Sequence, residues 1–437
     1  MGKLTGIPCF SSGNADLDRA FRLALDTLSA NTKPVQTGLL AEPCPCLTAG
    51  QDYPSPWTRD AAMNVWFAEA LLDQETARNT LLGVLGDGDG GPVVAGQYWD
   101  RIIWALGAER LWDLEQDPCF ARFSYGVLSR TAAACLREEF DPEDGLFRGP
   151  AVYGDGVSAY PEQYRNPSLS SSILRWPREH PEKCVPEGAG IPMKALSTNC
   201  AYEHAFRVLA RLAAVLGEDA APWILQADTL KASINRAFWN PETGLYDYLA
   251  GECSAQESLG LAFAILFGIA DSAQAGSILD HAYVSGHGVP CVWPVFPPYG
   301  DHGGFGRHCG TVWPHIQGFW ALAALKCGRG SLFSAELFSL ARHAVRDGQF
   351  AEIYHPADGR IYGGIQEGGG EYLEWRSCEN QTWSAAAFLG MVFYGIFGLG
   401  PDGSPGQSFL PEGIMRAVLD NLHAGGREIR LVIENNS

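Results

Sequence analysis

Apolar residues recur at the spacing of an amphipathic α-helix along almost the entire sequence. One such stripe comprises Leu17, Phe21, Leu25 and Leu28, and another comprises Tyr202, Phe206, Leu209, Leu212 and Leu216. The same periodicity predicts further helices at about 60–73, 99–114, 120–138, 222–237, 256–268, 272–283, 311–326, 334–347 and 382–397. Alternation typical of strands is scarce, so the sequence predicts an all-α fold.

A turn motif with proline and glycine recurs after three of the predicted helices. Its copies occupy residues 140–147, 239–246 and 354–362, and each is flanked by aromatic residues. Proline fixes φ, and the glycine three residues later tolerates a positive φ, so each copy predicts a tight turn at the end of a helix.

Repeated helix-turn units cannot bury their apolar faces alone, so we expect them to pack side by side around a shared core. The periods are too long and irregular for short solenoid repeats, which favours a closed ring of paired helices over an open solenoid. Long connections at 83–97, 144–197 and 284–310 would gather at one face of this ring. We therefore expect one domain over residues 1–400, followed at 401–437 by a short extension with one or two β-strands, because residues 428–434 alternate polar and apolar side chains.

The charge of the chain limits its partners. With a net charge of −19 and only 31 Lys and Arg residues, the chain lacks the basic surface that a nucleic acid requires. No apolar run is long enough to span a membrane, and the twelve cysteines lack paired zinc-ligand spacing. These features predict a cytoplasmic protein with reduced thiols and without a metal or cofactor; the oligomeric state is left open.

Two carboxylates lie in loops beside the turn motifs and are candidates for acid–base chemistry. Asp155 lies between glycines in Gly154-Asp-Gly156, shortly after the first turn, and could alternatively form a turn or cap a helix. Glu352 directly precedes the third turn on an apolar segment, and could alternatively be a structural carboxylate. Inverting glycosidases use such a pair, with carboxyl groups roughly 6.5–9.5 Å apart.

Two further clusters combine aromatic and charged residues at the start of predicted helices. In Trp57-Thr-Arg59-Asp60 an arginine can donate to sugar hydroxyls, an aspartate can accept from them, and the indole can stack on the ring. The segment Tyr98-Trp99-Asp100 offers similar chemistry. Helix capping is the alternative interpretation of both clusters.

Three segments of the chain resemble those of a known family of enzymes. The segments Trp57-Thr-Arg-Asp60, Glu352-Ile-Tyr-His-Pro-Ala-Asp-Gly359 and Gln381-Thr-Trp-Ser-Ala-Ala386 look like the landmark stretches of (α/α)6-barrel glycoside hydrolases. The similar members are processing α-glucosidases of glycoside hydrolase family 63, mannosylglycerate hydrolases and trehalases. The resemblance covers about residues 50–400.

The resemblance implies roles for individual residues. Asp155 would be the general acid and Glu352 the general base. Where that family has Gly-x-Asp followed by Ser and Arg-Trp, this chain has Gly154-Asp-Gly-Val-Ser158 leading into Tyr160-Pro-Glu162, so Glu162 remains the alternative acid. The residues expected to contact the substrate are Trp57, Arg59, Asp60, Tyr98, Trp99, Asp100, Gln256, Glu257, Trp313 and Trp383.

The sequence and the resemblance together predict an exo-acting glycoside hydrolase, inverting and α-specific, that acts on a small glycoside or oligosaccharide of the glucoside or mannoside type. Two rivals stay open at this point. One is an epimerase or lyase on the same fold, with His308, His315 or His355 as the acid or base. The other is a non-catalytic carbohydrate-binding protein.

Overall fold

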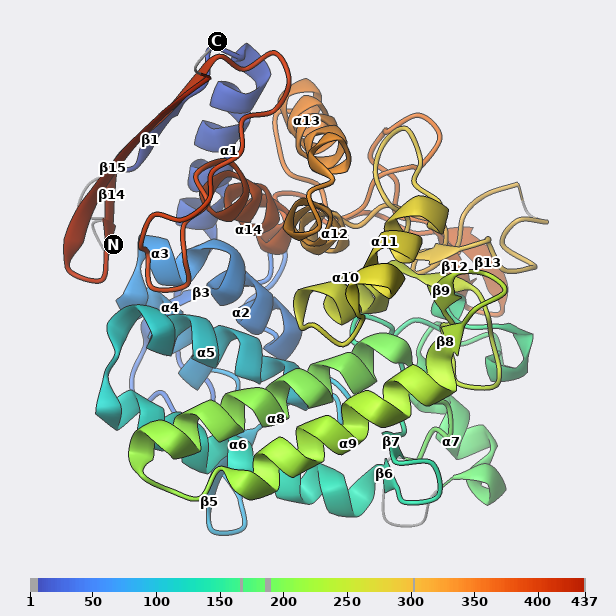
Figure 1. Ribbon diagram of the computed structural model, residues 1–437. Helices are drawn as coiled ribbons and strands as arrows, with labels where there is room; N and C mark the ends of the chain where they lie inside the picture. Colours follow the sequence, from blue (N-terminus) through green and yellow to red (C-terminus); the bar gives the residue numbers. More distant parts are fainter. Residues whose placement is uncertain (1–6, 166–167, 185–189, 302, 436–437) are drawn as a thin grey trace.

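The computed structural model describes residues 7–165, 168–184, 190–301 and 303–435, and most of the elements in Figure 1 are helices. The longer helices are α1 (Ala15–Asn31), α2 (Thr58–Asn64), α4 (Gln74–Leu82), α5 (Trp104–Glu115), α6 (Pro118–Glu138), α8 (Leu196–Leu216), α9 (Ala221–Phe238), α10 (Ser258–Leu266), α11 (Ser272–His281), α12 (Pro314–Lys326), α13 (Gly330–Asp347) and α14 (Thr382–Gly390). Short helices are α3 (Ala70–Leu72) and α7 (Trp176–Glu179), with single 3₁₀ turns at Arg101–Ile103, Val157–Ala159, Glu162–Tyr164, Ile173–Arg175 and Pro181–Lys183. The predicted dominance of helices is confirmed.

Within the described residues, six helices contact one another in a closed cycle. Helices α2, α5, α8, α10, α12 and α14 each pack against the next, and α14 packs against α2 again. The remaining long helices lie against members of this cycle: α1 on α14, α4 on α5, α6 and α9 on α8, α11 on α10, and α13 on α12. Figure 1 shows one such pair, α8 and α9, running side by side. Long helices therefore alternate along the chain between the cycle and its outer side.

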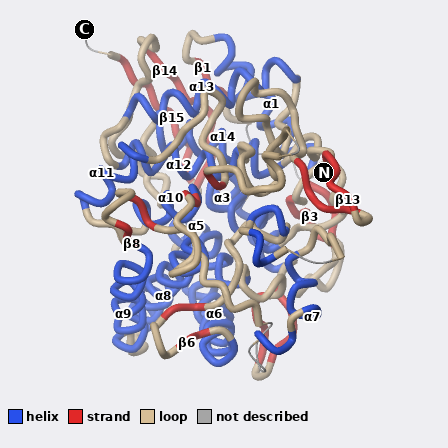
Figure 2. The backbone as a smooth tube through the Cα atoms, turned by 90° about the vertical axis from the view of Figure 1, so that its right-hand side faces the viewer, coloured by secondary structure: helices blue, strands red, loops and turns tan. Residues whose placement is uncertain are grey.

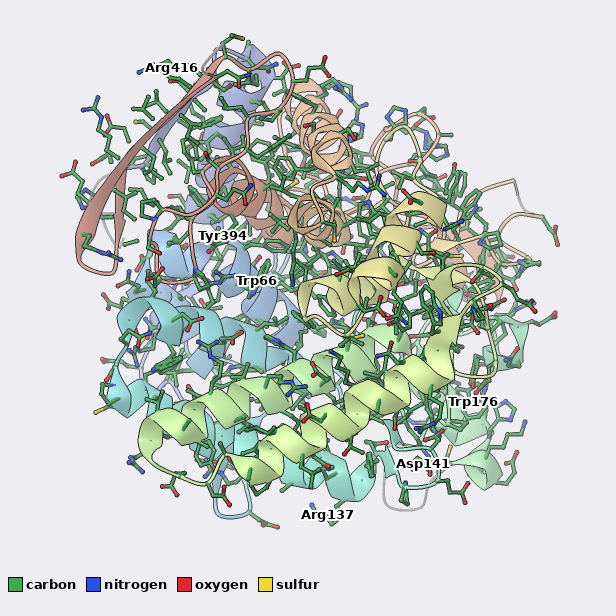
Figure 3. The ribbon with its side chains drawn as sticks, in the orientation of Figure 1. Trp66, Arg137, Asp141, Trp176, Tyr394 and Arg416 are labelled. Carbon is green, nitrogen blue, oxygen red and sulfur yellow. The ribbon has the colours of Figure 1, made fainter. Side chains whose placement is uncertain are left out.

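Two helices that the periodicity predicts as continuous contain a π-helical turn. Residues 60–73 fold as α2, the π-helix Val65–Glu69 and α3, and residues 382–397 fold as α14 and the π-helix Met391–Ile396. A π turn shifts the helical register and redirects side chains. Trp66 and Tyr394, labelled in Figure 3, come from these two turns and flank the Arg110 guanidinium at 4.7 and 4.4 Å from their ring centroids.

The three turn motifs have the predicted positive φ at their glycine, but the third does not directly follow a helix, because six residues separate it from the end of α13. The first two form hairpins whose strands are two residues long: β6 (Phe140–Asp141) with β7 (Leu146–Phe147), and β8 (Trp239–Asn240) with β9 (Leu245–Tyr246). Gly145, Gly244 and Gly359 have φ of 75°, 72° and 71°. The aromatic residues that flank the first two turns pair directly across the strands, which explains why they recur with the turn.

The strand predicted near the C-terminus belongs to a sheet that also includes the other end of the chain. Strands β14 (Arg416–Ala424) and β15 (Arg427–Glu434) are antiparallel, and β1 (Cys9–Ser11) pairs with β14. This narrow sheet lies along one side of the helices (Figures 1 and 2). The sequence does not predict β1, because three residues are too short to show alternation. The other strands form small hairpins or pairs: β2 (Thr32–Val35) with β3 (Cys44–Leu47), β4 (Leu85–Gly88) with β5 (Gly91–Val94), β10 (Gln256–Glu257) with β11 (Val292–Trp293), and β12 (Ile365–Gly368) with β13 (Glu371–Glu374).

One hydrophobic core connects the helices and the terminal sheet. Leu419 and Leu422 of β14 are fully buried in the same apolar cluster as Phe10 of β1 and Phe21 of α1. The sheet is therefore packed onto the helices through apolar side chains. None of the helices in the described part of the chain is both long enough and apolar enough to cross a membrane.

Candidate active site

A cavity of about 270 Å³ opens where three helices of the cycle begin. Trp57, Trp313 and Gln381 immediately precede α2, α12 and α14, and all three side chains line the cavity. Helix N-termini carry partial positive charge, so they favour anionic groups at this end. The full lining comprises Tyr53, Trp57, Arg59, Asp60, Gln97, Tyr153, Asp155, Gly156, Ser171, Ser172, Arg307, His308, Trp313, Glu352, Gln366, Trp375, Gln381 and Trp383.

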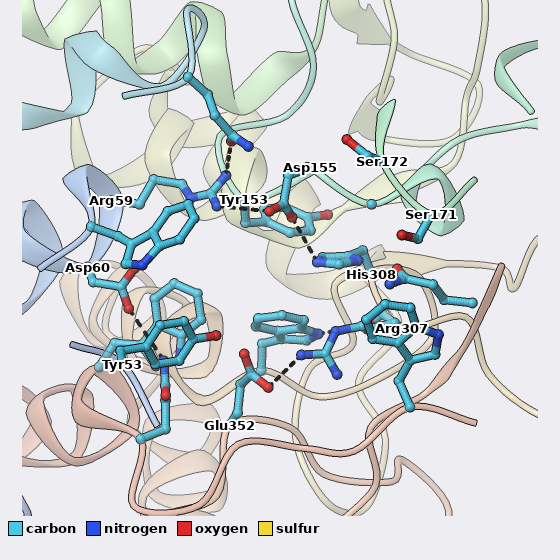
Figure 4. A pocket seen from close by; sticks show the side chains of 18 residues that line it. Tyr53, Arg59, Asp60, Tyr153, Asp155, Ser171, Ser172, Arg307, His308 and Glu352 are labelled. Atoms are coloured by element: carbon cyan, nitrogen blue, oxygen red, sulfur yellow. Dashed lines mark hydrogen bonds and ion pairs between the residues drawn. The ribbon is translucent and has the colours of Figure 1, made fainter. Parts of the chain in front are cut away.

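Asp155 and Glu352 face this cavity from opposite sides (Figure 4). Asp155 lies on the loop that follows β7, and Glu352 lies between α13 and the third turn motif. The two carboxylates are far apart in sequence, and the closed cycle of helices brings their loops to the same end of the molecule. Asp60 is a third carboxylate in the cavity wall.

Glu352 is buried and fixed through one of its two oxygens. Its Oε2 accepts a hydrogen bond from Arg307 Nη2 at 2.6 Å and another from the backbone N–H of Cys378 at 3.0 Å. Arg307 is itself held, because its Nη1 donates to the carbonyls of Gly363 and Arg376. The other oxygen, Oε1, has no hydrogen-bond partner among the described residues, so it is free to accept a proton.

Asp155 is held through both of its oxygens. Its Oδ2 accepts from Arg59 Nη2 at 3.3 Å, and its Oδ1 lies 3.2 Å from Nε2 of His308. Burial acts to raise the pKa of Asp155, but the charge of Arg59 and the contact with His308 outweigh it and hold the pKa well below its ordinary value. Asp155 is therefore ionised near neutral pH.

Arg59 lies among three carboxylates. Besides Asp155 it is 3.6 Å from Asp100 through its Nε, and Asp60 is its neighbour in α2. Burial raises the pKa of Asp60 to about 7 and that of Asp100 to about 7, although the nearby Arg59 opposes the shift in both. Among these residues, Asp60 is thus a cavity carboxyl that can hold a proton near neutral pH. In the part of the chain described, no three His, Cys, Asp or Glu side chains are placed to hold a metal ion.

The structure brings most of the sequence-predicted site residues together. The seven that line the cavity are Trp57, Arg59, Asp60, Asp155, Trp313, Glu352 and Trp383. Glu162, the alternative acid, has a side chain that is 82% exposed, pairs with Arg165 and does not line the cavity. This placement favours Asp155 over Glu162 as the carboxylate opposite Glu352.

Five predicted substrate contacts lie outside the cavity wall. The Trp99 indole donates to the carbonyl of Ala151, and the hydroxyl of Tyr98 accepts from the N–H of Ile191. Asp100 pairs with Arg59 behind the wall. Gln256 bonds Tyr283 and Ser258, and Glu257 accepts from the N–H of Ser197, with a pKa that burial raises to about 8. These residues also stand at helix starts. Aromatic and charged residues at a helix start therefore do not show by themselves whether a side chain lines the cavity or lies behind its wall.

Several cavity residues were not assigned to the site from the sequence. Arg307 lies in a Gly-rich loop without a recognisable motif, and His308 was considered only as an acid or base of the rival reactions. Gln366 and Trp375 belong to the hairpin of β12 and β13 and its end. For Arg307 and His308 the one sequence signal is position, because both lie shortly before Gly310-Thr-Val-Trp-Pro314, the segment that contains Trp313.

The comparison with known families is decisive for the class of protein. Residues 103–384 match the family described as the mannosylglycerate hydrolase MGH1-like glycoside hydrolase domain. The chain belongs to this family. It is therefore a glycosidase, as the resemblance of its motifs implied. No protein with a curated description matches this glycoside hydrolase.

Solved structures show the same fold at low sequence identity. A mannosylglycerate hydrolase of GH63 from Thermus thermophilus, in complex with glucose, is 18% identical with a TM-score of 0.61, and the match covers 85% of this chain and 99% of that one. A sialidase matches with a TM-score of 0.68 at 15% identity over 99% of this chain, which spans 38% of the sialidase's length. A GH78 rhamnosidase of Bacillus sp. GL1 matches with a TM-score of 0.60 at 16% identity, over 99% of this chain and 41% of the rhamnosidase.

Proposed function

We propose that this glycoside hydrolase is an exo-acting, inverting α-glycosidase with Glu352 as general base and Asp155 as general acid. The observation that carries the proposal is the position of these two carboxylates on opposite sides of one cavity. Inversion requires a base that activates water on one face of the sugar and an acid that protonates the leaving oxygen on the other.

The contacts of Glu352 suit the role of base. Arg307 and the N–H of Cys378 both bind Oε2, which fixes the carboxylate and stabilises its negative charge. Oε1 then accepts the proton of the attacking water, and the oxygen of that water forms the new bond to the anomeric carbon. Fixed geometry of this kind lowers the barrier because the water is held in position before the reaction.

The remaining cavity residues suit one terminal sugar. Trp57, Trp313 and Trp383 offer apolar faces, while Arg59 and Asp60 can donate to and accept from hydroxyl groups. The cavity volume of about 270 Å³ lies below the range of roughly 300–1,000 Å³ that is typical of pockets for drug-sized ligands. A pocket of this size supports exo-action on a small glycoside rather than binding of a long polymer.

The fold supports the same proposal. The closed cycle of helices, with outer helices packed on it, is the arrangement expected of an (α/α)6 barrel. We assign this catalytic barrel to residues 1–400 and a short β extension to residues 401–437, with β1 pairing to the extension from the start of the chain. Structural relatives were solved with glucose and with D-glycerate, which favours small α-glucosides and α-mannosides as substrates.

A panel of α- and β-linked glucosides and mannosides, including α-mannosylglycerate, tests the proposal. Proton NMR during the first minutes of turnover identifies the anomer that is released. We expect hydrolysis of an α-glycoside with release of the β-anomer. Release of the α-anomer would contradict inversion, and formation of an epimer or an unsaturated sugar without uptake of water would replace the hydrolase by one of the rival reactions.

A further inference from the structure

The proposed role of Asp155 as general acid requires a source for the proton that it donates. A general acid must carry a proton, yet donors occupy both oxygens of this carboxylate: Arg59 at Oδ2 and His308 at Oδ1. An arginine in a protein does not give up its proton. A protonated imidazole can give up its proton, so Oδ1 is the oxygen at which the contacts allow Asp155 to become an acid.

We propose that His308 is a positioning residue that supplies, through Asp155, the proton received by the leaving group. Nε2 of His308 passes its proton to Oδ1 of Asp155, and Asp155 passes a proton to the glycosidic oxygen. This inference rests on the proposed function, and it assigns a hydrolytic role to a histidine that the sequence suggested only for the rival reactions.

The protons balance over one turnover. The bond between the anomeric carbon and the glycosidic oxygen breaks, and its electron pair stays on that oxygen, which gains the proton relayed from His308. The water oxygen forms the new bond, and the water's proton goes to Glu352. Solvent then reprotonates His308 and removes the proton from Glu352, so the enzyme returns to its starting state.

The structure commits the His308 ring to Asp155. The ring stacks on Trp313 with a centroid distance of 4.9 Å and is buried. Its other nitrogen, Nδ1, has no hydrogen-bond partner among the described residues, so the Asp155 carboxylate is the polar contact that orients the ring. The backbone N–H of His308 donates to the hydroxyl of Ser158, which fixes the loop of His308 to the loop of Asp155.

The absence of a side chain at Gly156 allows the His308 imidazole to lie against the Asp155 loop. A Cβ atom at this position would lie 2.3 Å from Nδ1 of His308, so the ring fits only against a glycine. The φ of Gly156 is −90°, which any residue adopts, so backbone conformation does not require a glycine here. The close approach of the histidine ring accounts for this half of the Gly154-Asp-Gly156 motif.

The charged surroundings determine how the pair titrates. Burial lowers the pKa of His308, and the contact with Asp155 opposes this. The other charged or titratable groups that face the pair are Arg59, Asp60, Asp100, Tyr160, Arg307, His315 and Glu352. Because the two sites interact strongly, the pair shares its titration, and we expect the proton needed for catalysis to be lost as the pH rises.

Leaving groups that need no proton provide the test. Departure of 2,4-dinitrophenolate requires little acid assistance, whereas departure of methanol requires it. For the sugar that the panel identifies, we expect His308→Gln to lower kcat/KM for the methyl glycoside by about 100-fold, within the range typical of acid catalysis. The same variant should retain kcat/KM for the 2,4-dinitrophenyl glycoside within a few-fold, and Asp155→Asn should show the same selectivity.

A matched control exists on the neighbouring loop. His355 also pairs with an aspartate, Asp358, at 3.1 Å, but it does not line the cavity. We expect His355→Gln to lower neither rate. Thermal unfolding of each variant verifies that it is folded, and if His308→Gln is unfolded, Gly156→Ala displaces the same ring and should produce the same selectivity.

The pH profile adds a readout that a structural role would not change. For the methyl glycoside, the alkaline limb of kcat should move to lower pH in His308→Gln, because Arg59 still favours ionised Asp155 and the relayed proton is lost. Equal losses on both substrates, or an unchanged alkaline limb, would overturn the role of His308 while the hydrolase remains. If the unmodified chain hydrolyses no glycoside, the proposed function fails and this inference fails with it.

Discussion

Asp155 and Glu352 line the same cavity but are bound in different ways. The two contacts of Glu352 share one oxygen, and its side chain is 4% exposed. The contacts of Asp155 occupy both oxygens, and its side chain is 35% exposed. An ion pair with arginine therefore leaves one carboxylate ready to accept a proton and the other dependent on a neighbour to provide one.

The largest effect is expected at Glu352. Replacing it with Gln keeps the shape of the side chain but removes the carboxylate that we propose accepts the proton of water. We expect kcat to fall by about 10⁴-fold, the upper part of the range for a general base. Steady-state kinetics on the α-glycoside identified by the panel measure this change, and circular dichroism verifies that the variant is folded.

Glu336 provides the control for this substitution. It is also a buried glutamate, but it lies on α13 outside the cavity, and burial raises its pKa to about 8. We expect Glu336→Gln to leave kcat unchanged. A Glu352→Gln variant with near-normal kcat would remove the base assignment and with it the contrast between the two carboxylates.

The second effect concerns the cation that holds Glu352. Arg307→Ala removes the ion pair to Oε2 and both contacts that anchor the guanidinium to backbone carbonyls. The carboxylate would then be free to rotate out of line with the water, so we expect a fall in kcat of about 100-fold with a smaller change in KM. Arg360→Ala, which removes a half-exposed arginine from the third turn, should leave both constants unchanged. Equal kcat values for the two variants would show that Arg307 does not position the base.

The residues of this site differ in how far the sequence could predict them. Asp155, Glu352, Trp57 and Arg59 stand in motifs, with glycine, proline or aromatic neighbours, so pattern and resemblance were enough to select them. Arg307 also has glycine neighbours, but it stands in no recognisable motif. It reaches Glu352 only because the loop before α12 pairs with Ile365 at the start of β12 and with the segment that precedes it, and sequence separation gives no indication of that contact.

The fold shows the same division. Most helices longer than two turns and the tight turns leave local signals, so their positions were predicted within a few residues. Helix α4 has few apolar residues and begins at an Asp73 cap, so its periodicity was too weak to detect. The pairing of β1 with β14 joins the two ends of the chain through three residues, which no local pattern can predict.

The third effect is a pH-dependent change in the free energy of unfolding that arises from Asp100, a neighbour of Asp155. Asp100 shares Arg59 with Asp155, and burial raises the pKa of Asp100 to about 7 from an ordinary value near 4. Between these values the unfolded chain has lost this proton while the folded chain retains it, so the contribution of Asp100 to the free energy of unfolding falls as the pH rises. The slope approaches about 1.4 kcal/mol per pH unit.

Asp100→Asn removes this titration and keeps the size of the side chain. Denaturant unfolding at pH 4 and at pH 7 should therefore show that the variant gains stability relative to the unmodified chain as the pH rises. If the difference in free energy of unfolding between the variant and the unmodified chain is the same at both pH values, Asp100 is ionised at both. Arg59 would then be paired with two ionised carboxylates, Asp100 and Asp155.

The smallest effects are expected at two tryptophans, one near the site for the sugar and one near the site for its leaving group. Trp57 and Trp375 both line the cavity and are 46% and 39% exposed, so each can offer a face to a substrate. Trp375 follows the hairpin whose Gln366 packs beside Gly156, next to Asp155, the proposed general acid. We expect Trp375→Ala to raise KM about 2- to 10-fold only for substrates with a large leaving group, and Trp57→Ala to raise it for every substrate of the same sugar. The general acid and the leaving group must lie on the same side of the sugar. If Trp375→Ala raised KM for methyl glycosides as much as for glycosides with a large leaving group, the leaving group would not lie beside Trp375. The roles assigned to Asp155 and Glu352 would then be reversed.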